Sequence, residues 1–252
     1  MSESSEYSEK YSSVKMERQD GIITVLLHTN GGSLRWSLTA HAELPEAFHD
    51  IGGDRENRIM ILTGIGDEFS GPAATPGTTL FENRPPIELM DRIHWEGRRL
   101  LTNLLDIEIP IICAVNGPAR NPLLSDIVLA SETAAFQDSA HFMFELVPGD
   151  GVHVLYPLLL GWNRARYFLL TGQIIGAAKA LELGLVAEVL PPDAVFARAR
   201  ALAASMVGKP RLLLRYTRLL FTEHMRKQMQ DLLGYGLALE SMALMERPLA
   251  RN

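Results

Sequence analysis

The chain contains the stretch Pro110-Ile111-Ile112-Cys113-Ala114-Val115-Asn116-Gly117, which says more about the fold than any other part of it. Five consecutive apolar residues between a proline and an Asn-Gly pair are typical of a strand buried on both faces, because such a strand needs no polar alternation. Cys113 is the single cysteine of the chain, so no internal disulfide can form. Inside an apolar strand, its thiol is predicted to be buried and inert.

Short apolar runs and helical patterns alternate around this stretch. A polar turn at Gln19-Asp20-Gly21 separates two strand-like runs, which predicts a hairpin within residues 14–28. Residues 59–63 predict another buried strand. Helical apolar spacing covers residues 39–50 and 87–105.

The second half of the chain becomes helical. Asp126 to Ala130 indicates the start of a helix or a short apolar segment. The later helical patterns cover residues 154–160, 164–170, 177–183, 192–207 and 211–245. This order predicts an α/β fold with a loose, flexible polar arm at residues 1–13, a core at residues 14–190 and a helical region at residues 191–252.

Composition excludes several classes of protein. The 252 residues are 47% hydrophobic and 21% charged, with a formal net charge of −6, which is ordinary globular composition without the basic face of a nucleic-acid binder. No apolar run approaches the roughly 20 residues that span a bilayer, so we expect no membrane partner. Met1 to Lys10 lacks the basic start and apolar centre of a signal peptide. A cytoplasmic location is therefore predicted.

Several phrases together resemble one enzyme family. They are Ile61-Leu62-Thr63-Gly64, Phe69-Ser70-Gly71, the Pro110–Gly117 stretch, Val147-Pro148-Gly149-Asp150-Gly151 and Leu169-Leu170-Thr171-Gly172. In order and spacing they are similar to the enoyl-CoA hydratase/isomerase (crotonase) superfamily over about residues 14–250. The resemblance implies a crotonase-like spiral of ββα turns as the core, a helical C-terminal trimerisation region, and trimers that can pair into hexamers.

The departures from that family point away from coenzyme A. Its members place backbone N–H groups after the Phe-Ser and Asn-Gly pairs to form an oxyanion hole for a thioester. Here these segments are Gly71-Pro72-Ala73-Ala74-Thr75 and Pro118-Ala119-Arg120-Asn121-Pro122-Leu123. Because Pro72, Pro118 and Pro122 have no N–H to donate, the resemblance predicts a damaged thioester site.

The candidate acid and base residues suggest a particular branch. Counting back from Pro148-Gly149, the position of the hydratase glutamate carries His141. Trp36, His141, Asp150 and Glu240 resemble the set found in 6-oxocamphor hydrolase-like β-diketone hydrolases. That branch also has a histidine in the loop after Gly117, whereas residues 118–125 contain none and are shortened.

The resemblance implies a role for each of these side chains. His141 would be the base for water, because imidazole titrates near neutrality, and Asp150 would hold its tautomer and stabilise the imidazolium. Glu240 would position or activate the water, or accept a proton later. The indole N–H of Trp36 would donate to a substrate carbonyl. Asp138 is either a partner of this set or a plain loop acid.

No cofactor or metal is expected. The seven histidines are scattered, and none forms a zinc-binding motif. His153, which lies near the candidate site, is predicted to be a helix-face residue.

The leading functional prediction is a cofactor-independent hydrolase that cleaves the C–C bond of cyclic or bicyclic β-diketones by a retro-Claisen reaction, giving keto acids. Two alternatives stay open: a coenzyme A-dependent hydratase or isomerase, and a non-catalytic scaffold with the same fold. The expected partners are a small diketone and further copies of the chain, as a trimer or a dimer of trimers.

Overall fold

The computed structural model describes residues 7–70, 83–119 and 124–248. Its central element is a six-stranded sheet of order β1-β2-β3-β4-β5-β8, in which only the β1–β2 pair is antiparallel. A separate antiparallel pair is formed by β6 and β7. The strands are β1 (Val14–Gln19), β2 (Ile22–Leu27), β3 (Ile59–Gly64), β4 (Ile111–Val115), β5 (Ile127–Ser131), β6 (Ala135–Phe136), β7 (Ile175–Gly176) and β8 (Glu188–Leu190).

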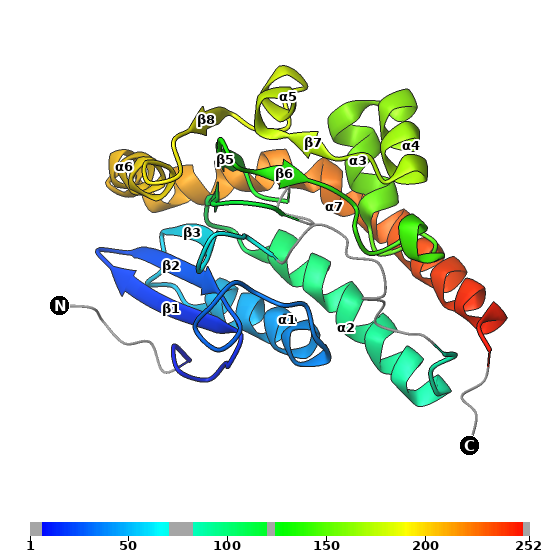
Figure 1. Cartoon of the computed structure of the whole chain (residues 1–252). Coiled ribbons are helices and arrows are strands. Elements are labelled where there is room, and N and C mark those ends of the chain that lie inside the picture. The colour runs from blue at the N-terminus through cyan, green and yellow to red at the C-terminus, as the bar shows by residue number, and fades with distance from the viewer. Residues whose placement is uncertain (1–6, 71–82, 120–123, 249–252) are drawn as a thin grey trace.

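Helices cover the sheet and then extend beyond it (Figure 1). They are α1 (Leu38–Gly53), α2 (Ile87–Asp106), α3 (Val152–Leu160), α4 (Trp162–Thr171), α5 (Ala177–Glu182), α6 (Val195–Val207) and α7 (Arg211–Ala243), with 3₁₀ turns η1 (Phe142–Phe144) and η2 (Leu244–Glu246). In Figure 1, α7 is a single long helix that runs from near α6, past α2, to the region of α3 and η1. The predicted α/β order with a helical C-terminal region is confirmed.

The central strands are mostly apolar because both of their faces are buried. Ile59 and Ile61 point into a core formed with α6, whereas Met60 and Leu62 point into the larger core on the other face. Cys113 is free and fully buried, and burial raises the pKa of its thiol. The predicted burial of this strand and of its cysteine is therefore confirmed, and the inertness of the thiol stays a prediction.

Two local predictions have different outcomes. The hairpin is confirmed: Asp20 and Gly21 both have positive φ, at 52° and 77°, as a two-residue turn matched to the twist of its strands requires. Of the two alternatives for Asp126 to Ala130, the start of a helix is wrong and the short apolar segment is confirmed. These residues largely form β5, because Ile127 pairs in parallel with Ile112 at the centre of the sheet.

The Asn-Gly pair that follows β4 joins two neighbouring backbone segments. The Asn116 side chain accepts from the Gly64 N–H at 3.2 Å and donates to the Gly66 carbonyl at 2.8 Å, which ties together the segments after β3 and β4. A Cβ at Gly117 would stand 1.8 Å from the Asp67 carbonyl oxygen. Only glycine permits this close approach of two backbones.

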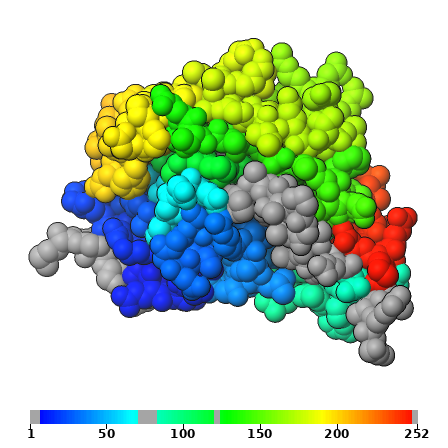
Figure 2. Space-filling view, in the orientation of Figure 1, coloured from blue at the N-terminus to red at the C-terminus, as the bar shows by residue number. Residues whose placement is uncertain are grey.

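The described part of the predicted arm lies against α1. Tyr7 donates to Asp54 at 2.8 Å, and Tyr11 donates to Asp50 at 2.6 Å. Glu43 accepts from the backbone of residues 12 and 13. In Figure 2, these N-terminal elements, in blue, adjoin the later green and yellow elements in one continuous surface.

The long helix α7 is held at both ends. Arg218 is 2% exposed and bonds to Asp126 at 2.8 Å and to backbone carbonyls at the end of α2, including Ile107. Further along, Leu233 and Leu237 are buried in the large core. These contacts place the last turns of α7 beside the turn that precedes α3. Among the described residues, no helix has the length and apolarity to cross a bilayer.

Candidate active site

His141 lies in the short loop between β6 and η1. Gln137 fixes the start of this loop by donating to the Gly172 carbonyl at 2.8 Å. The carbonyl of His141 accepts from the N–H groups of Phe144, at 2.7 Å, and Leu146, at 3.1 Å. The backbone around His141 is therefore set by local bonds, and its side chain is 3% exposed.

The imidazole of His141 lies between two carboxylates. Its Nδ1 is 2.6 Å from Asp138 Oδ1, and its Nε2 is 3.3 Å from Asp150 Oδ2. Burial lowers the pKa of His141, but the charge of Asp150 and the hydrogen bond from Asp138 outweigh burial and hold that pKa well above its ordinary value. Asp138 thus contacts Nδ1 and Asp150 contacts Nε2, so each ring nitrogen of His141 faces a carboxylate.

The two carboxylates differ in exposure. Only 1% of the Asp138 side chain is accessible, compared with 37% of the Asp150 side chain. Asp150 lies in the turn before α3, where Gly151 has a φ of 97° and the Val152 N–H helps to lower the pKa of the carboxyl. Burial opposes that lowering, but the charge of His141 overcomes it. The Asp150 side chain, which contacts Nε2, is thus the more accessible of the two, although its Oδ1 is buried.

Glu240 enters the same cluster from α7. Burial raises the pKa of Glu240 to about 8; the charge of His141 opposes that rise, and the charges of Asp150 and Asp138 add to it. Glu240 lies against Gly149, where an added Cβ would meet its Cβ at 2.9 Å. Segments about 90 residues apart in sequence therefore share one electrostatic environment.

Several buried polar atoms of this region have no hydrogen-bond partner among the described protein groups. They are Asp138 Oδ2, Asp150 Oδ1, Glu240 Oε2, Ser139 Oγ and Tyr156 Oη. Buried polar groups are normally satisfied, so a cluster of unsatisfied ones marks a place for polar ligand atoms or water. The arrangement fits a reaction that handles water and protons.

Trp36 belongs to a different local network. It precedes Ser37, whose hydroxyl caps α1, and its ring meets that of His41 edge-to-face at 5.8 Å. A residue before the cap that packs on the fourth helical residue forms a staple. His41 in turn bonds to Glu96 at 2.8 Å. The structure thus groups His141, Asp150 and Glu240, and it places Trp36 beside His41.

Two features of this region were not assigned from the sequence. Asp138 was left open as a partner or a loop acid, although its spacing of three residues from His141 was the available signal. The buried His41–Glu96 pair gave no signal, because 55 residues separate its members.

His153 bonds through Nε2 to the Leu232 carbonyl at 3.2 Å, which is a contact between helices.

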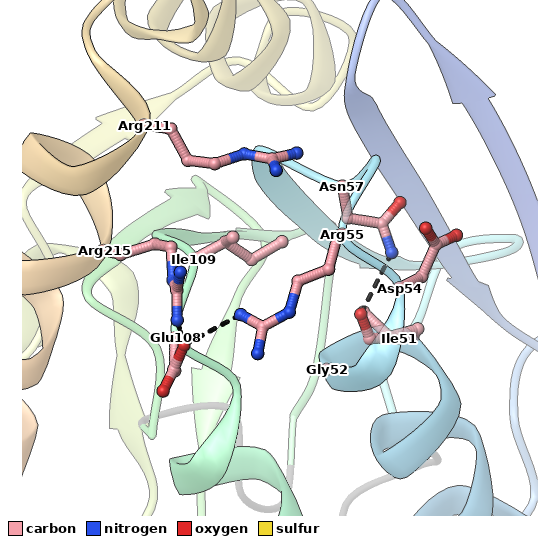
Figure 3. A pocket seen from close by; sticks show the side chains of 9 residues that line it. All are labelled: Ile51, Gly52, Asp54, Arg55, Asn57, Glu108, Ile109, Arg211 and Arg215. Carbon is pink, nitrogen blue, oxygen red and sulfur yellow. Dashed lines mark hydrogen bonds and ion pairs between the residues drawn. The ribbon is translucent and has the colours of Figure 1, made fainter.

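A shallow pocket lies elsewhere, at the ends of α1 and α2 and the start of α7 (Figure 3). In Figure 3, Arg55 and Arg215 both point toward Glu108, and Arg55 lies 3.2 Å from its carboxylate. Both guanidinium groups thus share the single carboxylate of Glu108. None of the pocket's residues belongs to the His141 cluster.

The predicted loss of the thioester oxyanion hole involves residues 71–75 and 120–123, which lie outside the described residues. Of the nearby groups, the Phe69 N–H donates to the Pro118 carbonyl at 3.0 Å. That bond occupies a backbone donor at the edge of this region. Within residues 7–70, 83–119 and 124–248, no group of three or more His, Cys, Asp or Glu side chains is arranged to hold a metal ion.

The family follows from comparison with known proteins. Residues 17–249 match the family model described as enoyl-CoA hydratase/isomerase. The chain belongs to this family, within the crotonase superfamily. The resemblance inferred from the sequence phrases, and the crotonase fold that it implied, are thereby confirmed.

Individual relatives differ in what they are named for. A β-diketone hydrolase from the cyanobacterium Anabaena, solved with (S)-3-oxocyclohexyl acetic acid, is 44% identical, with a TM-score of 0.89 over 96% of this chain and 98% of that one. A probable enoyl-CoA hydratase from Mycobacterium bovis is 32% identical over 66% of this chain. A 1,2-epoxyphenylacetyl-CoA isomerase from Escherichia coli is 27% identical over 76% of this chain and 75% of its own length. The match to the mycobacterial protein spans 61% of that protein's length.

Proposed function

We propose that this chain is a cofactor-independent hydrolase that cleaves the C–C bond between the carbonyls of cyclic or bicyclic β-diketones and releases keto acids. The observation that carries the proposal is His141 held between Asp138 and Asp150, with Glu240 in the same electrostatic environment. The similarity to a β-diketone hydrolase over nearly the whole chain supports it.

The reaction needs only water and proton transfers. Water adds to one carbonyl, and the tetrahedral intermediate collapses by breaking its bond to the central carbon. The electron pair of that bond forms an enolate, which the second carbonyl stabilises, and a proton then adds to the enolate carbon. The sum is one diketone plus one water giving one keto acid.

His141 fits the role of base for the attacking water. It can remove a proton only when it is neutral, whereas its carboxylate partners favour the imidazolium. The active form therefore has one proton fewer than the form that the cluster favours at low pH. Asp138 keeps Nδ1 protonated in that form, so the free electron pair is on Nε2, on the side of Asp150.

Glu240 fits the role of proton donor. With a pKa of about 8 it is largely protonated near neutral pH, so it can protonate the enolate that C–C cleavage produces. The charge that it then carries is adjacent to the imidazolium of His141, which stabilises it. Because the groups interact, their titrations are shared within the cluster.

The substrate class rests on apolar surface beside the cluster. Phe142 and Met143, on η1 directly after His141, are 49% and 48% exposed. A cyclic hydrocarbon frame can pack on such side chains while its carbonyls reach the polar groups. The cyclic keto acid bound to the Anabaena hydrolase is of the product type that this reaction yields. Trp36 remains a proposed carbonyl donor.

A coenzyme A-dependent reaction is the second candidate. It is favoured by the enoyl-CoA hydratase and CoA isomerase names of sequence relatives. Against it stand the prolines in the two oxyanion segments and the replacement of the hydratase glutamate by His141. Under the third candidate, a scaffold, no substitution at His141 would affect any reaction.

The proposed assembly is supported by exposed apolar side chains. On α7, Leu220 and Phe221 are 79% and 74% exposed. We propose that these surfaces are covered in a trimer or a dimer of trimers. Sedimentation equilibrium of the wild type and of Phe221→Asp tests this: a monomeric wild type contradicts the proposed assembly.

The activity is tested with purified protein and a panel of cyclic and bicyclic 1,3-diketones, without coenzyme A. Substrate loss and keto acid formation are followed for the wild type, His141→Ala and the surface control His49→Ala. Turnover by the wild type and the control, but not by folded His141→Ala, supports the proposal. No turnover on the panel, together with tight binding of an acyl-CoA, contradicts it.

A further inference from the structure

Tyr156 is a buried polar residue that the proposed reaction does not use. It lies on α3, its side chain is fully buried, and its ring packs against Phe168 with centroids 4.4 Å apart. Its hydroxyl has no hydrogen-bond partner among the described protein groups. A buried tyrosine hydroxyl normally has a partner, so its position here requires an explanation beyond packing.

The surroundings of the hydroxyl are acidic. Burial raises the pKa of Tyr156, and the negative charges of Asp138 and then Asp150 raise it further, which places both carboxylates within electrostatic range. Asp138 uses Oδ1 to bind His141, while its Oδ2 is buried and unsatisfied. A phenol supplies a donor, and a carboxylate oxygen needs one.

We propose that Tyr156 is a positioning residue of the His141 site, whose hydroxyl donates through one ordered water to the Asp138 oxygen that does not bind His141. Only its kinetic consequence rests on the proposed hydrolase function. The bridge would fix the orientation of a carboxylate whose side chain is 1% accessible. It would also draw negative charge away from the oxygen that faces His141.

The direction of the expected change in the His141 pKa follows from the negative charge on Asp138. Without the hydroxyl, Asp138 attracts the proton on His141 more strongly, so the pKa of His141 rises, on the order of half a unit to one unit. The neutral fraction of His141 near pH 7 then falls about three- to tenfold, and kcat falls with it. KM changes little, because the side chain of Tyr156 is fully buried, and kcat recovers at higher pH.

The experiment compares Tyr156→Phe with the wild type by NMR titration of the His141 ring protons, which His141→Gln identifies among the seven histidines. Tyr167→Phe removes a 60% exposed hydroxyl on α4 and is the matched control. The expected result is a raised His141 pKa in Tyr156→Phe alone. An unchanged or lowered pKa overturns the proposal, even if the variant is less stable.

A second measurement tests the same proposal if Tyr156→Phe does not fold. Incorporating 3-fluorotyrosine makes the phenol a stronger donor and retains its shape. The pKa of His141 should then fall relative to unlabelled protein, and no shift overturns the proposal. Neither titration needs a substrate, so failure of the hydrolase proposal would be seen separately, as absence of turnover in the wild type.

Discussion

The backbones of Gly149 and Gly236 are in direct contact: a Cβ placed on Gly149 would stand 2.2 Å from the Gly236 carbonyl oxygen. This contact seats α7 on the turn that carries Asp150. Glu240 lies about one helical turn beyond Gly236, so the same contact brings its carboxyl to the cluster. Two residues without side chains thus determine the relative position of three ionisable ones.

Gly236→Ala is therefore expected to separate α7 from the site. Its new Cβ would meet His153 at 2.2 Å and the Gly149 carbonyl at 2.5 Å. We predict a loss of about 1–3 kcal/mol in the free energy of unfolding and a lower kcat, measured by urea denaturation and diketone turnover. Gly234→Ala, on the same helix with nothing within 4 Å, is the control and should be neutral or slightly stabilising. If Gly236→Ala and Gly234→Ala had the same free energy of unfolding and the same kcat, the account would be contradicted.

Asp138→Asn tests which carboxylate fixes the His141 tautomer. The amide keeps the shape but can donate to Nδ1, which favours the wrong tautomer, and it removes a charge that raises the pKa of His141. We predict a fall in kcat of the order of 10²-fold or more, together with a lower His141 pKa by NMR. If only Asp150→Asn has these effects, the assignment to Asp138 is wrong.

Stability should fall as the solution becomes alkaline. The pKa of Glu240 is raised in the folded state, from 4.5 to about 8, so its contribution to stability is full below the unfolded pKa and is lost as pH rises through the folded value. His141, with its raised pKa, acts in the same direction. Asp150, with its lowered pKa, contributes above its ordinary pKa and loses that contribution in strong acid.

Glu240→Gln isolates one part of this dependence. Near pH 9 the variant should be more stable than the wild type by about 1 kcal/mol or more, because it avoids a buried charge, and near pH 5 the advantage should vanish. Urea denaturation at both pH values measures it. Glu223→Gln, at an exposed position of α7, should show neither effect. An equal advantage at both pH values would show that Glu240 is not buried in the folded chain.

Arg218→Met tests the other anchor of α7. The substitution leaves Asp126 and the carbonyls at the end of α2 without their charged donor. We predict a loss of about 3–5 kcal/mol in the free energy of unfolding, which is typical of a broken buried ion pair. Arg226→Met, which removes a partly exposed pair with Asp106, should cost less than about 1 kcal/mol. If both substitutions lowered the free energy of unfolding by similar amounts, Arg218 would not be a special anchor of α7.

The sequence predicted what periodicity and turn chemistry control. The buried β4 strand, the turn at Asp20-Gly21 and the helical second half all follow from local patterns. β5 was predicted only as the start of a helix or a short apolar segment, because its pairing with β4 involves residues that are distant in the sequence. The assignment of 14–190 and 191–252 as separate regions remains a prediction.

The candidate site was predictable only in part, because some of its contacts depend on how segments pack. His141, Asp150 and Glu240 were named from phrases that resemble a family, and the structure brings them together. The partner of Nδ1 depends on the direction of one carboxyl in a short loop, which sequence spacing permits but does not determine. The His41–Glu96 pair joins two helices, so its existence depends on how they pack.

The most direct test of the central claim is turnover of a cyclic 1,3-diketone in heavy-oxygen water without coenzyme A, with the wild type and folded His141→Ala side by side. The account predicts a keto acid that carries one heavy oxygen in its new carboxylate from the wild type and none from the variant. An unlabelled product, or an equal yield from both proteins, would contradict it.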